Sequence, residues 1–317
     1  MGGYSVQQIL VYPVKACRAV SVPCAAISST GLLYDREWMV VSADKGRLIA
    51  QVLAPKLALV TPSLPAEAFK GEALGPNAML EIQAPGMPLL KIPLKRPALQ
   101  ANSALVNVNI YGWEGQGVDE GSKAASWWSS YLGRPVRFVR FNPALVDRQV
   151  EHAPDGYQTG FTNTGQFLVA SEASLEDLNK RLPRAVSMNR FRPNFIINGP
   201  PAFEEDKWGR FSITHSDKEL QFTFVHPCAR CKVPTINQEN PEGTGEEPLK
   251  TLATFRTGKL LQVNVGGAKQ VFFGTYFVCA NTLFKGGSTP DESAFVAVND
   301  PLIVAEFTRK TELTDWQ

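Results

Sequence analysis

Short runs of β-branched and aromatic residues, separated by Gly, Pro and Asn, recur along this 317-residue chain and constrain its fold more than any other feature. Runs of this length and composition are typical of strands. Their close spacing favours barrels over alternating strand–helix units. The runs that we expect to form strands are 6–12, 38–41, 106–111, 136–141, 167–170, 194–198, 220–225, 260–265, 271–278, 295–298 and 302–307.

Three segments carry helix signals. The first, 122–132, stops at Gly133, and the second, 174–182, has a capping-box Asp177 and stops at a proline. The third, 248–255, starts with proline at its first position. Helices that are this few and scattered predict an α+β, β-rich fold.

The chain is long enough for two hydrophobic cores. Its polar stretch 142–165, rich in Pro, Asp, Thr and Gly, is the place where we expect the chain to pass between them or to line a site. We therefore expect domains at 1–145 and 146–317.

Charge and motifs exclude several functions. With 32 basic and 30 acidic residues, the formal charge of +2 predicts neither nucleic-acid binding nor binding to an anionic membrane. Neither G-x-G-x-x-G after a strand nor G-x-x-x-x-G-K-S/T occurs, and the G-x-S-x-G elbow is absent as well. No apolar run is long enough for a transmembrane anchor. Five cysteines at irregular spacing indicate reduced thiols and a cytoplasmic protein.

Two cysteines, Cys228 and Cys231, follow a strand-like run and begin a predicted loop. A thiolate is a soft ligand that suits heavier transition metals, and the neighbouring Arg230 and Lys232 would favour the ionised form of Cys231.

Other interpretations of the same cysteines stay open. With His226 they supply at most three ligands, whereas structural zinc requires four. A thioredoxin-like pair should open a helix, but Val233 and Pro234 indicate an extended chain. Two buried cysteines acting as small apolar side chains are the third alternative.

Basic residues stand in separate loops that suit phosphate binding. Lys15 follows the first predicted strand, Arg36 precedes the second, and Arg192 lies in the run Asn189-Arg-Phe-Arg-Pro-Asn194. Arginine forks and lysine point charges both recognise phosphate. Each alone would more often be a solvated surface charge, and spacing alone does not show that they converge.

Taken together, these segments resemble the mitochondrial amidoxime reducing component family over most of the chain, from about Val6 to Phe307. Members carry a MOSC N-terminal β-barrel-like domain followed by a MOSC β-barrel domain with a few short helices. The matching stretches include Tyr12-Pro-Val-Lys15, Gly31-Leu-Leu-Tyr-Asp-Arg36, Phe191-Arg-Pro-Asn194, Glu205-Asp206, Cys228-Ala-Arg-Cys231, Pro248-Leu249 and Phe273-Gly-x-Tyr276.

The resemblance implies a molybdenum cofactor, Mo-molybdopterin, bound between the two domains, with the Cys231 thiolate as the protein's ligand to the metal. It implies two-electron reduction of amidoximes or other N-hydroxylated compounds, and reduction of nitrite to nitric oxide, with Cys231 and Asn163 as the catalytic residues. The positions expected to contact the cofactor are Lys15, Ala16, Arg36, Thr162, Asn163, Arg192, Asn194, Ala229, Arg230 and Cys231.

This sequence departs from the family pattern near the expected site. Ala16 stands where members often carry a serine, and 50–55 lacks a basic and an acidic residue that are common there. Asn163 replaces the acid often found beside the cofactor, which puts a proton-transfer role at that position in doubt.

Partners follow from the same resemblance. The sequence has no motif for a flavin, a nicotinamide or an iron–sulfur cluster, so an external donor is expected: cytochrome b5 with NADH cytochrome b5 reductase, or nitrate reductase. We expect a monomer in the cytoplasm, with the mitochondrion as the alternative. A cofactor carrier, or a sulfurase-like MOSC protein without reductase activity, is the competing function. Pyridoxal phosphate is implied only by homology to such sulfurases, whose pyridoxal-phosphate domain we do not expect in this chain.

Overall fold

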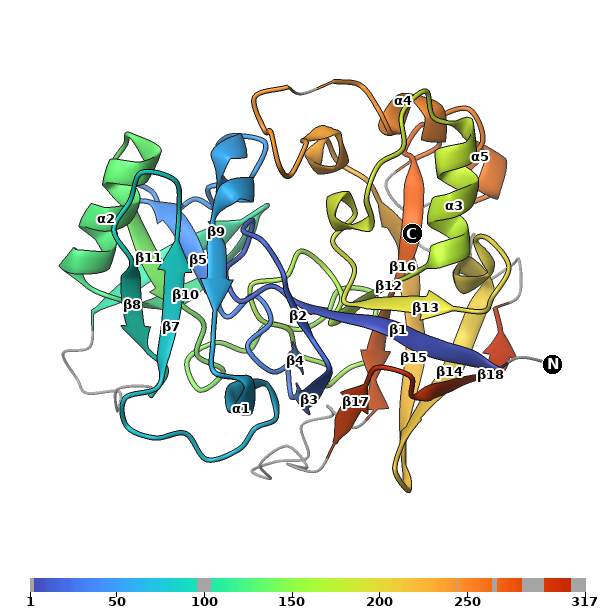
Figure 1. Ribbon diagram of the computed structural model, residues 1–317, viewed down its shortest axis with the longest axis horizontal. Helices are drawn as coiled ribbons and strands as arrows, with labels where there is room; N and C mark the ends of the chain where they lie inside the picture. Colours follow the sequence, from blue (N-terminus) through green and yellow to red (C-terminus); the bar gives the residue numbers. More distant parts are fainter. Residues whose placement is uncertain (1–2, 96–103, 244, 264–266, 281–293, 309–317) are drawn as a thin grey trace.

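The first strand of the chain closes a barrel whose other strands come from the second half. The computed structural model describes residues 3–95, 104–243, 245–263, 267–280 and 294–308. The barrel lies on the right of Figure 1. The closed ring has the order β13 (Phe195–Asn198), β12 (Phe167–Ser171), β16 (Phe272–Cys279), β15 (Lys218–Ala229), β14 (Trp208–His215), β18 (Pro301–Phe307) and β1 (Tyr4–Val11), and β2 (Val20–Val22) pairs with β1 outside the ring. Because β1 pairs with β13 as well as with β18, the sheet closes on itself.

Apolar side chains of alternate strand positions fill this barrel. Phe167, Phe195, Phe211 and Phe222 are all buried in one cluster, and neighbouring rings stack or meet edge to face. Successive side chains of a strand point to opposite faces, so one face of each strand supplies the core. The predicted β-rich α+β fold is therefore confirmed.

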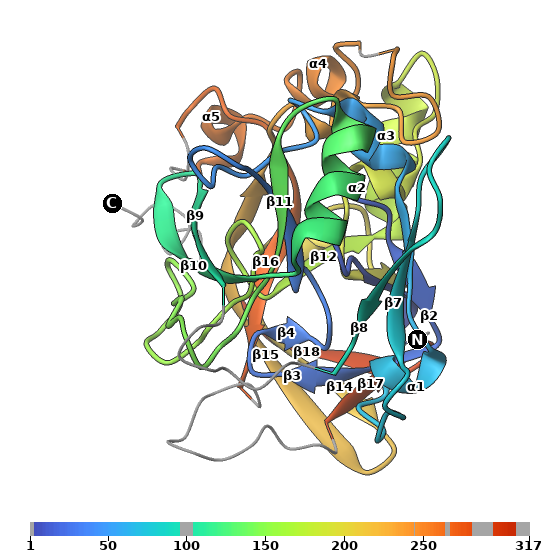
Figure 2. The ribbon, with the colours of Figure 1, turned by 90° about the vertical axis from the view of Figure 1, so that its left-hand side faces the viewer.

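Smaller sheets build the first half of the chain. One sheet has the order β5 (Trp38–Ser42), β11 (Val136–Arg140), β10 (Trp113–Asp119) and β9 (Leu105–Ile110); a second has the order β6 (Thr61–Ser63), β7 (Met79–Gln83) and β8 (Leu90–Pro93). Helix α2 (Ser122–Leu132) contacts β11 and β8, and Figure 2 shows it between them. Trp128 of α2 is fully buried beside Phe138 of β11.

A third small sheet connects the two halves. It has the order β17 (Phe295–Ala297), β3 (Cys24–Ser28) and β4 (Gly31–Leu32). The barrel thus takes strands from the start of the chain, and the sheet of β3 takes one from near its end. The boundary that we expect near residue 145 stays a prediction.

The remaining helices are short. Among the described residues, no helix is long and apolar enough to cross a membrane. The α-helices besides α2 are α1 (Ala66–Phe69), α3 (Glu172–Arg181), α4 (Leu249–Leu252) and α5 (Gly258–Leu261), and the 3-10 helices are η1 (Pro55–Leu59), η2 (Met188–Arg190), η3 (Glu204–Lys207) and η4 (Val233–Thr235).

The segment 260–265 was wrongly predicted to be a strand. Helix α5 occupies its first residues, because the side chain of Thr257 accepts a hydrogen bond from the Leu260 amide and caps the helix. Residues 264–266 lie outside the described residues. A short apolar run does not by itself distinguish a strand from a helix.

Two predicted helices have different bounds. Helix α3 starts at Glu172 rather than at Ser174, because Ser171 is its N-cap and accepts a hydrogen bond from the Ser174 amide. Helix α4 is shorter than 248–255 and has Pro248 as its N-cap.

A buried carboxyl group at Glu205, in η3, holds this N-terminus of α3 in place. Its oxygens accept hydrogen bonds from the Ser171 amide (3.1 Å), the Ser171 hydroxyl (3.0 Å) and the Ser174 hydroxyl (2.6 Å). Burial raises the pKa of Glu205 to about 7, and the charge of Asp206 acts in the same direction. Burial therefore outweighs these hydrogen bonds, which favour the ionised carboxylate.

We expect Glu205→Gln to flatten the pH dependence of stability. The raised pKa means that the folded protein binds this proton more tightly than the unfolded chain does. The contribution is complete below the usual carboxyl pKa and is lost as the pH rises through about 7. Urea unfolding between about pH 5 and about pH 8 should show a loss of a few kcal/mol at most in the wild type, and less in the variant. The exposed Glu219→Gln is the control, and equal slopes in all three proteins would contradict the assignment.

Candidate functional site

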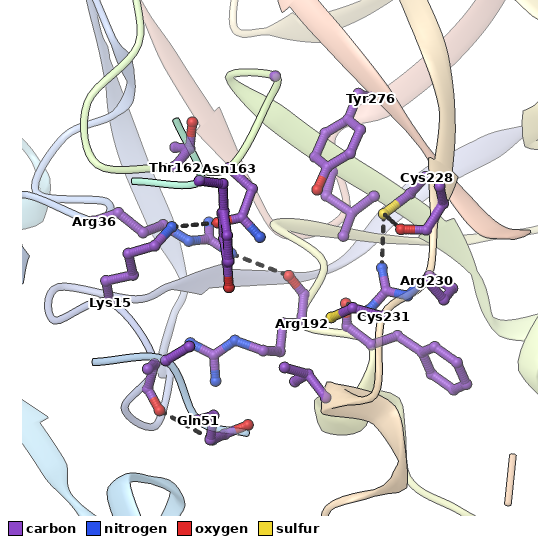
Figure 3. Close-up of a pocket in the computed structure, with 18 of the residues that line it drawn as sticks. Lys15, Arg36, Gln51, Thr162, Asn163, Arg192, Cys228, Arg230, Cys231 and Tyr276 are labelled. Atoms are coloured by element: carbon purple, nitrogen blue, oxygen red, sulfur yellow. Dashed lines mark hydrogen bonds between the residues drawn. The ribbon is translucent and has the colours of Figure 1, made fainter. Parts of the chain in front are cut away.

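A pocket lies where loops of the first half meet the end of β15. Figure 3 shows Lys15, Arg36, Thr162 and Asn163 on one side of it and Cys228, Arg230 and Tyr276 on the other. All ten positions expected from sequence to contact a cofactor line this pocket: Lys15, Ala16, Arg36, Thr162, Asn163, Arg192, Asn194, Ala229, Arg230 and Cys231. The predicted residues therefore converge on one pocket, which their spacing alone could not establish. The roles of these residues stay predictions.

The ring of Tyr12 organises two of the arginines. The guanidinium carbons of Arg36 and Arg192 each lie 4.3 Å from its centroid. Asp35 accepts a hydrogen bond from the Tyr12 amide at 2.8 Å and forms an ion pair with Arg36. An aromatic face attracts cations, so this ring brings two like charges close together.

Asn194 ties this cluster to the barrel. Its side-chain oxygen accepts hydrogen bonds from Arg36 at 3.0 Å and from the Leu168 amide at 3.2 Å, and its amide nitrogen donates to the Leu10 carbonyl at 3.2 Å. Since Asn194 is buried and bonds to Arg36 and to the backbone of both strands, it positions Arg36 relative to β1 and β12.

Lys15 is buried and directed at the loop that carries Asn163. Its ammonium group donates hydrogen bonds to the Phe161 carbonyl (2.7 Å) and to the side-chain oxygen of Asn163. Burial lowers the pKa of Lys15 well below its usual value, and the charges of Arg148, Arg36 and Arg192 lower it further. An anion bound nearby would favour the charged form.

Arg148 was missed by the sequence analysis. Its guanidinium group is buried and donates to the carbonyls of Gly160 (2.6 Å) and Thr162 (2.9 Å), which fixes the loop that contributes Thr162 and Asn163. The sequence placed this loop near a site, but nothing in the run around Arg148 indicates which basic residue turns inward.

Four non-glycine residues of the pocket have a left-handed backbone: Ala16 (φ 72°), Arg36 (φ 48°), Tyr111 (φ 51°) and Arg192 (φ 59°). Residues other than glycine adopt this conformation at a cost, and such strain often occurs at functional sites. Here the strained turns direct two arginines onto Tyr12.

The charge of the pocket is strongly one-sided. Four basic side chains, Lys15, Arg36, Arg192 and Arg230, line it, and the described lining residues include no carboxylate. The Nε atom of Arg230 is buried without a partner among the described residues. Burial lowers the pKa of Arg192 to about 10. These properties fit an anionic ligand that offers several oxygen acceptors.

The two cysteines differ in environment. Cys228 is buried inside β15, and Cys231 follows the strand, is exposed and lines the pocket. The prediction that both begin a loop is therefore wrong for Cys228. Strand β15 continues through Pro227 because register shifts on either side of it absorb a residue that cannot donate to the ladder.

Arg230 contacts a different sulfur from the one we predicted. Its guanidinium donates to the Cys228 sulfur at 2.9 Å and to the Phe191 carbonyl at 2.7 Å. Lys232 is exposed and lines a separate groove with Val52 and Leu249. The charge of Arg230 thus interacts with Cys231 as expected, while its hydrogen bond goes to Cys228, and the contribution of Lys232 stays a prediction.

The contacts shown for His226 are with residues other than the two cysteines. Its Nδ1 donates to the Pro227 carbonyl at 2.8 Å, and its ring packs against His152 and Tyr276. Within the described part of the chain, no three Cys, His, Asp or Glu side chains form a cluster suited to a metal. The arrangement does not favour the structural-zinc interpretation.

Two glutamines join the halves beside the pocket. The side-chain amides of Gln51 and Gln238 bond to each other at 3.0 and 3.3 Å, and Gln51 also donates to the Ala16 carbonyl. Gln51 lines the pocket but was not among the predicted positions. A pair of amides 187 residues apart leaves no signal in spacing.

Tyr276 is another lining residue that was missed, although it belongs to a motif quoted above. A Cβ atom at Gly165 would lie 2.8 Å from that of Tyr276, so a glycine is required for the loop to approach this strand.

We expect inorganic pyrophosphate to raise the melting temperature by a few degrees, because a bound anion relieves the repulsion among the four cations. Arg192→Gln should reduce this rise, whereas Arg210→Gln, at an exposed arginine of β14, should leave it unchanged. Thermal unfolding with sodium chloride at matched ionic strength separates binding from screening. An undiminished rise in Arg192→Gln would contradict the assignment.

Comparisons with known proteins identify two domains. The MOSC N-terminal beta barrel domain matches residues 3–135, and the MOSC domain matches residues 156–302. Among curated proteins, the chain is 32% identical over 286 residues to "Mitochondrial amidoxime-reducing component 1" of Homo sapiens, covering 87% of this chain and 79% of that protein.

Other relatives match to a similar extent. "Mitochondrial amidoxime-reducing component 1" of Mus musculus is 33% identical, with 87% of this chain and 78% of that protein covered. "Mitochondrial amidoxime reducing component 2" of Bos taurus is 31% identical, with 80% and 72% covered. The likeness thus includes both matched domains.

Proposed function

The chain belongs to the mitochondrial amidoxime-reducing component family, and on that premise we propose that it is a molybdenum-cofactor-dependent reductase of N-oxygenated compounds. The observation that carries the proposal is a single pocket in which an exposed thiol, Cys231, stands among four basic side chains without a lining carboxylate. A soft metal ligand and an anion site are the two features that this cofactor requires.

The molybdenum cofactor supplies, when bound, the two-electron reduction of an N–O bond, with the oxygen released as water. Cys231 would ligate the metal through its thiolate. Lys15, Arg36 and Arg192 would hold the phosphate and pterin by charge-assisted hydrogen bonds. Ala16, Thr162, Asn194, Ala229 and Arg230 complete the binding residues that we propose.

Asn163 would orient substrate or cofactor atoms and would not transfer protons. Its side-chain oxygen is already held by the Lys15 ammonium group, and an amide does not exchange a proton at neutral pH in the way that a carboxylic acid does. We therefore assign Asn163 the placement of substrate or cofactor atoms, while solvent at the open side of the pocket supplies protons.

Electrons would come from another protein. We propose cytochrome b5 with NADH cytochrome b5 reductase as the electron donor, and nitrate reductase as a substitute donor. Membership of this family suggests an external electron-transfer system. Amidoximes, other N-hydroxylated compounds and nitrite are the proposed substrates. The relatives are named mitochondrial, and we keep the cytoplasm as the proposed location with the mitochondrion as the alternative.

We expect Cys231→Ser to abolish amidoxime reduction without unfolding the protein, because a serine is a hard and poorly ionised ligand. Activity on benzamidoxime, measured with reduced methyl viologen as electron source, should fall by about three orders of magnitude or more. Molybdenum analysis and circular dichroism accompany the assay. Turnover in this variant near the wild-type rate would refute the assignment, and molybdenum binding without any reductase activity in the wild type would instead indicate a cofactor carrier.

Cys228 provides the matched comparison. Cys228→Ser keeps an acceptor for the Arg230 guanidinium and should be mild, whereas Cys228→Ala leaves a buried donor unpaired and should cost about 1–3 kcal/mol of stability. Chemical unfolding measures that difference. Complete loss of molybdenum in Cys228→Ser would indicate a site with two thiolates.

A further inference from the structure

An aromatic side chain stands at the open side of the pocket without an evident structural reason. Tyr111 is 66% exposed although it is large and partly apolar, and it lines the pocket together with Cys231. Partial burial, and after it the charge of Cys231, raise the pKa of Tyr111.

The backbone holds Tyr111 in an unfavourable conformation. Tyr111 (φ 51°) and Gly112 (φ 100°) form the two-residue connection between β9 and β10, and both are left-handed. Hairpin connections of this kind favour Asn-Gly or Asp-Gly. A tyrosine at the first position is conformationally unfavourable, and the turn itself does not require this residue.

The hairpin that carries this turn is anchored on both strands. Asn109 exchanges backbone hydrogen bonds with Gly46 (2.9 Å) and Leu48 (3.0 Å), and its side chain accepts one from the Gly112 amide (3.3 Å). On the other strand, the Arg148 guanidinium lies 4.5 Å from the Trp113 ring. The turn is therefore fixed relative to the pocket, and the Tyr111 side chain starts from a defined position.

Apolar residues accompany Tyr111 in the lining. Leu48 and Ala50 come from the first half and Val233 from the second, and Cys231 is exposed among the lining residues. The cations of the pocket would be occupied by an anionic cofactor, so the apolar and aromatic lining is left for the part of the substrate that carries no charge.

We propose that Tyr111 is a specificity-determining residue that forms an aromatic wall for the substrate. It favours N-oxygenated compounds in which an aryl group is bonded to the carbon that carries the N–O nitrogen. This inference rests on the proposed function. Stacking of two aromatic rings contributes binding free energy beyond that of the apolar area that they bury, and an aliphatic substrate lacks this contribution. Tyr111 contacts the substrate's ring and takes no part in the bond changes.

The test compares two substrates that differ in the ring alone, benzamidoxime and acetamidoxime, on the cofactor-loaded protein with reduced methyl viologen as electron source. Tyr111→Asn removes the ring but keeps a residue that tolerates the left-handed turn. Tyr111→Phe keeps the ring and removes the hydroxyl. Leu105→Ala, at a half-exposed residue on the far end of the same hairpin, is the control.

We expect Tyr111→Asn to raise KM for benzamidoxime roughly two- to tenfold with kcat nearly unchanged, and to leave KM for acetamidoxime unaltered. Tyr111→Phe and Leu105→Ala should behave as the wild type. Calorimetry without turnover should show the same difference for the two products. Tyr111→Asn should weaken the binding of benzamidine and leave the binding of acetamidine unchanged.

Equal effects of Tyr111→Asn on both substrates, or no effect on either, would overturn the proposal. If the Tyr111 hydroxyl were the functional group, Tyr111→Phe would raise KM for benzamidoxime, and this result would also overturn the proposal. If the wild type reduces acetamidoxime but shows no preference that depends on Tyr111, the specificity inference fails while the proposed function stands. Reduction of neither compound refutes the proposed function itself.

Discussion

Mutual repulsion among the basic side chains of the pocket is the constraint on which the rest of the site depends. Lys15 and Arg230 bond to backbone carbonyls, and Arg36 forms an ion pair with Asp35, a carboxylate outside the lining of the pocket. Carbonyls satisfy the donors without neutralising their charge, so the field of the cluster remains available to a ligand. Asn194, the Tyr12 ring and the left-handed backbone of Arg36 and Arg192 hold the cations in place against this repulsion.

Much of the fold could be predicted from patterning, because most barrel strands are short apolar runs bounded by turn residues. The predicted run 167–170 corresponds to β12 with an error of one residue at its end, and the run 271–278 corresponds to β16 with a shift of one residue at both ends. What patterning could not show is closure. Strand β1 pairs with β13, whose residues are nearly two hundred positions away, and no local signal specifies that pairing.

The site was predictable where a motif carries its own chemistry and unpredictable where geometry alone selects the residue. Cys231 and Arg192 stand in recognisable runs, and both reach the pocket. Arg148 and Gln51 look like ordinary polar residues in the sequence, and only the folded chain shows that one fixes a loop and the other joins Gln238. Arg230 was expected beside Cys231 but faces Cys228, because strand β15 extends further than its apolar run indicates.

The position of β1 has a consequence for the order of events during synthesis. This strand leaves the ribosome before its partners β13 and β18, which follow it much later in the sequence. Until then its unpaired edge and apolar face have no native neighbour, and they are open to wrong association. Lys15 and Tyr12 follow directly after β1, so the anion pocket can be assembled only late, after translation of the barrel is nearly complete.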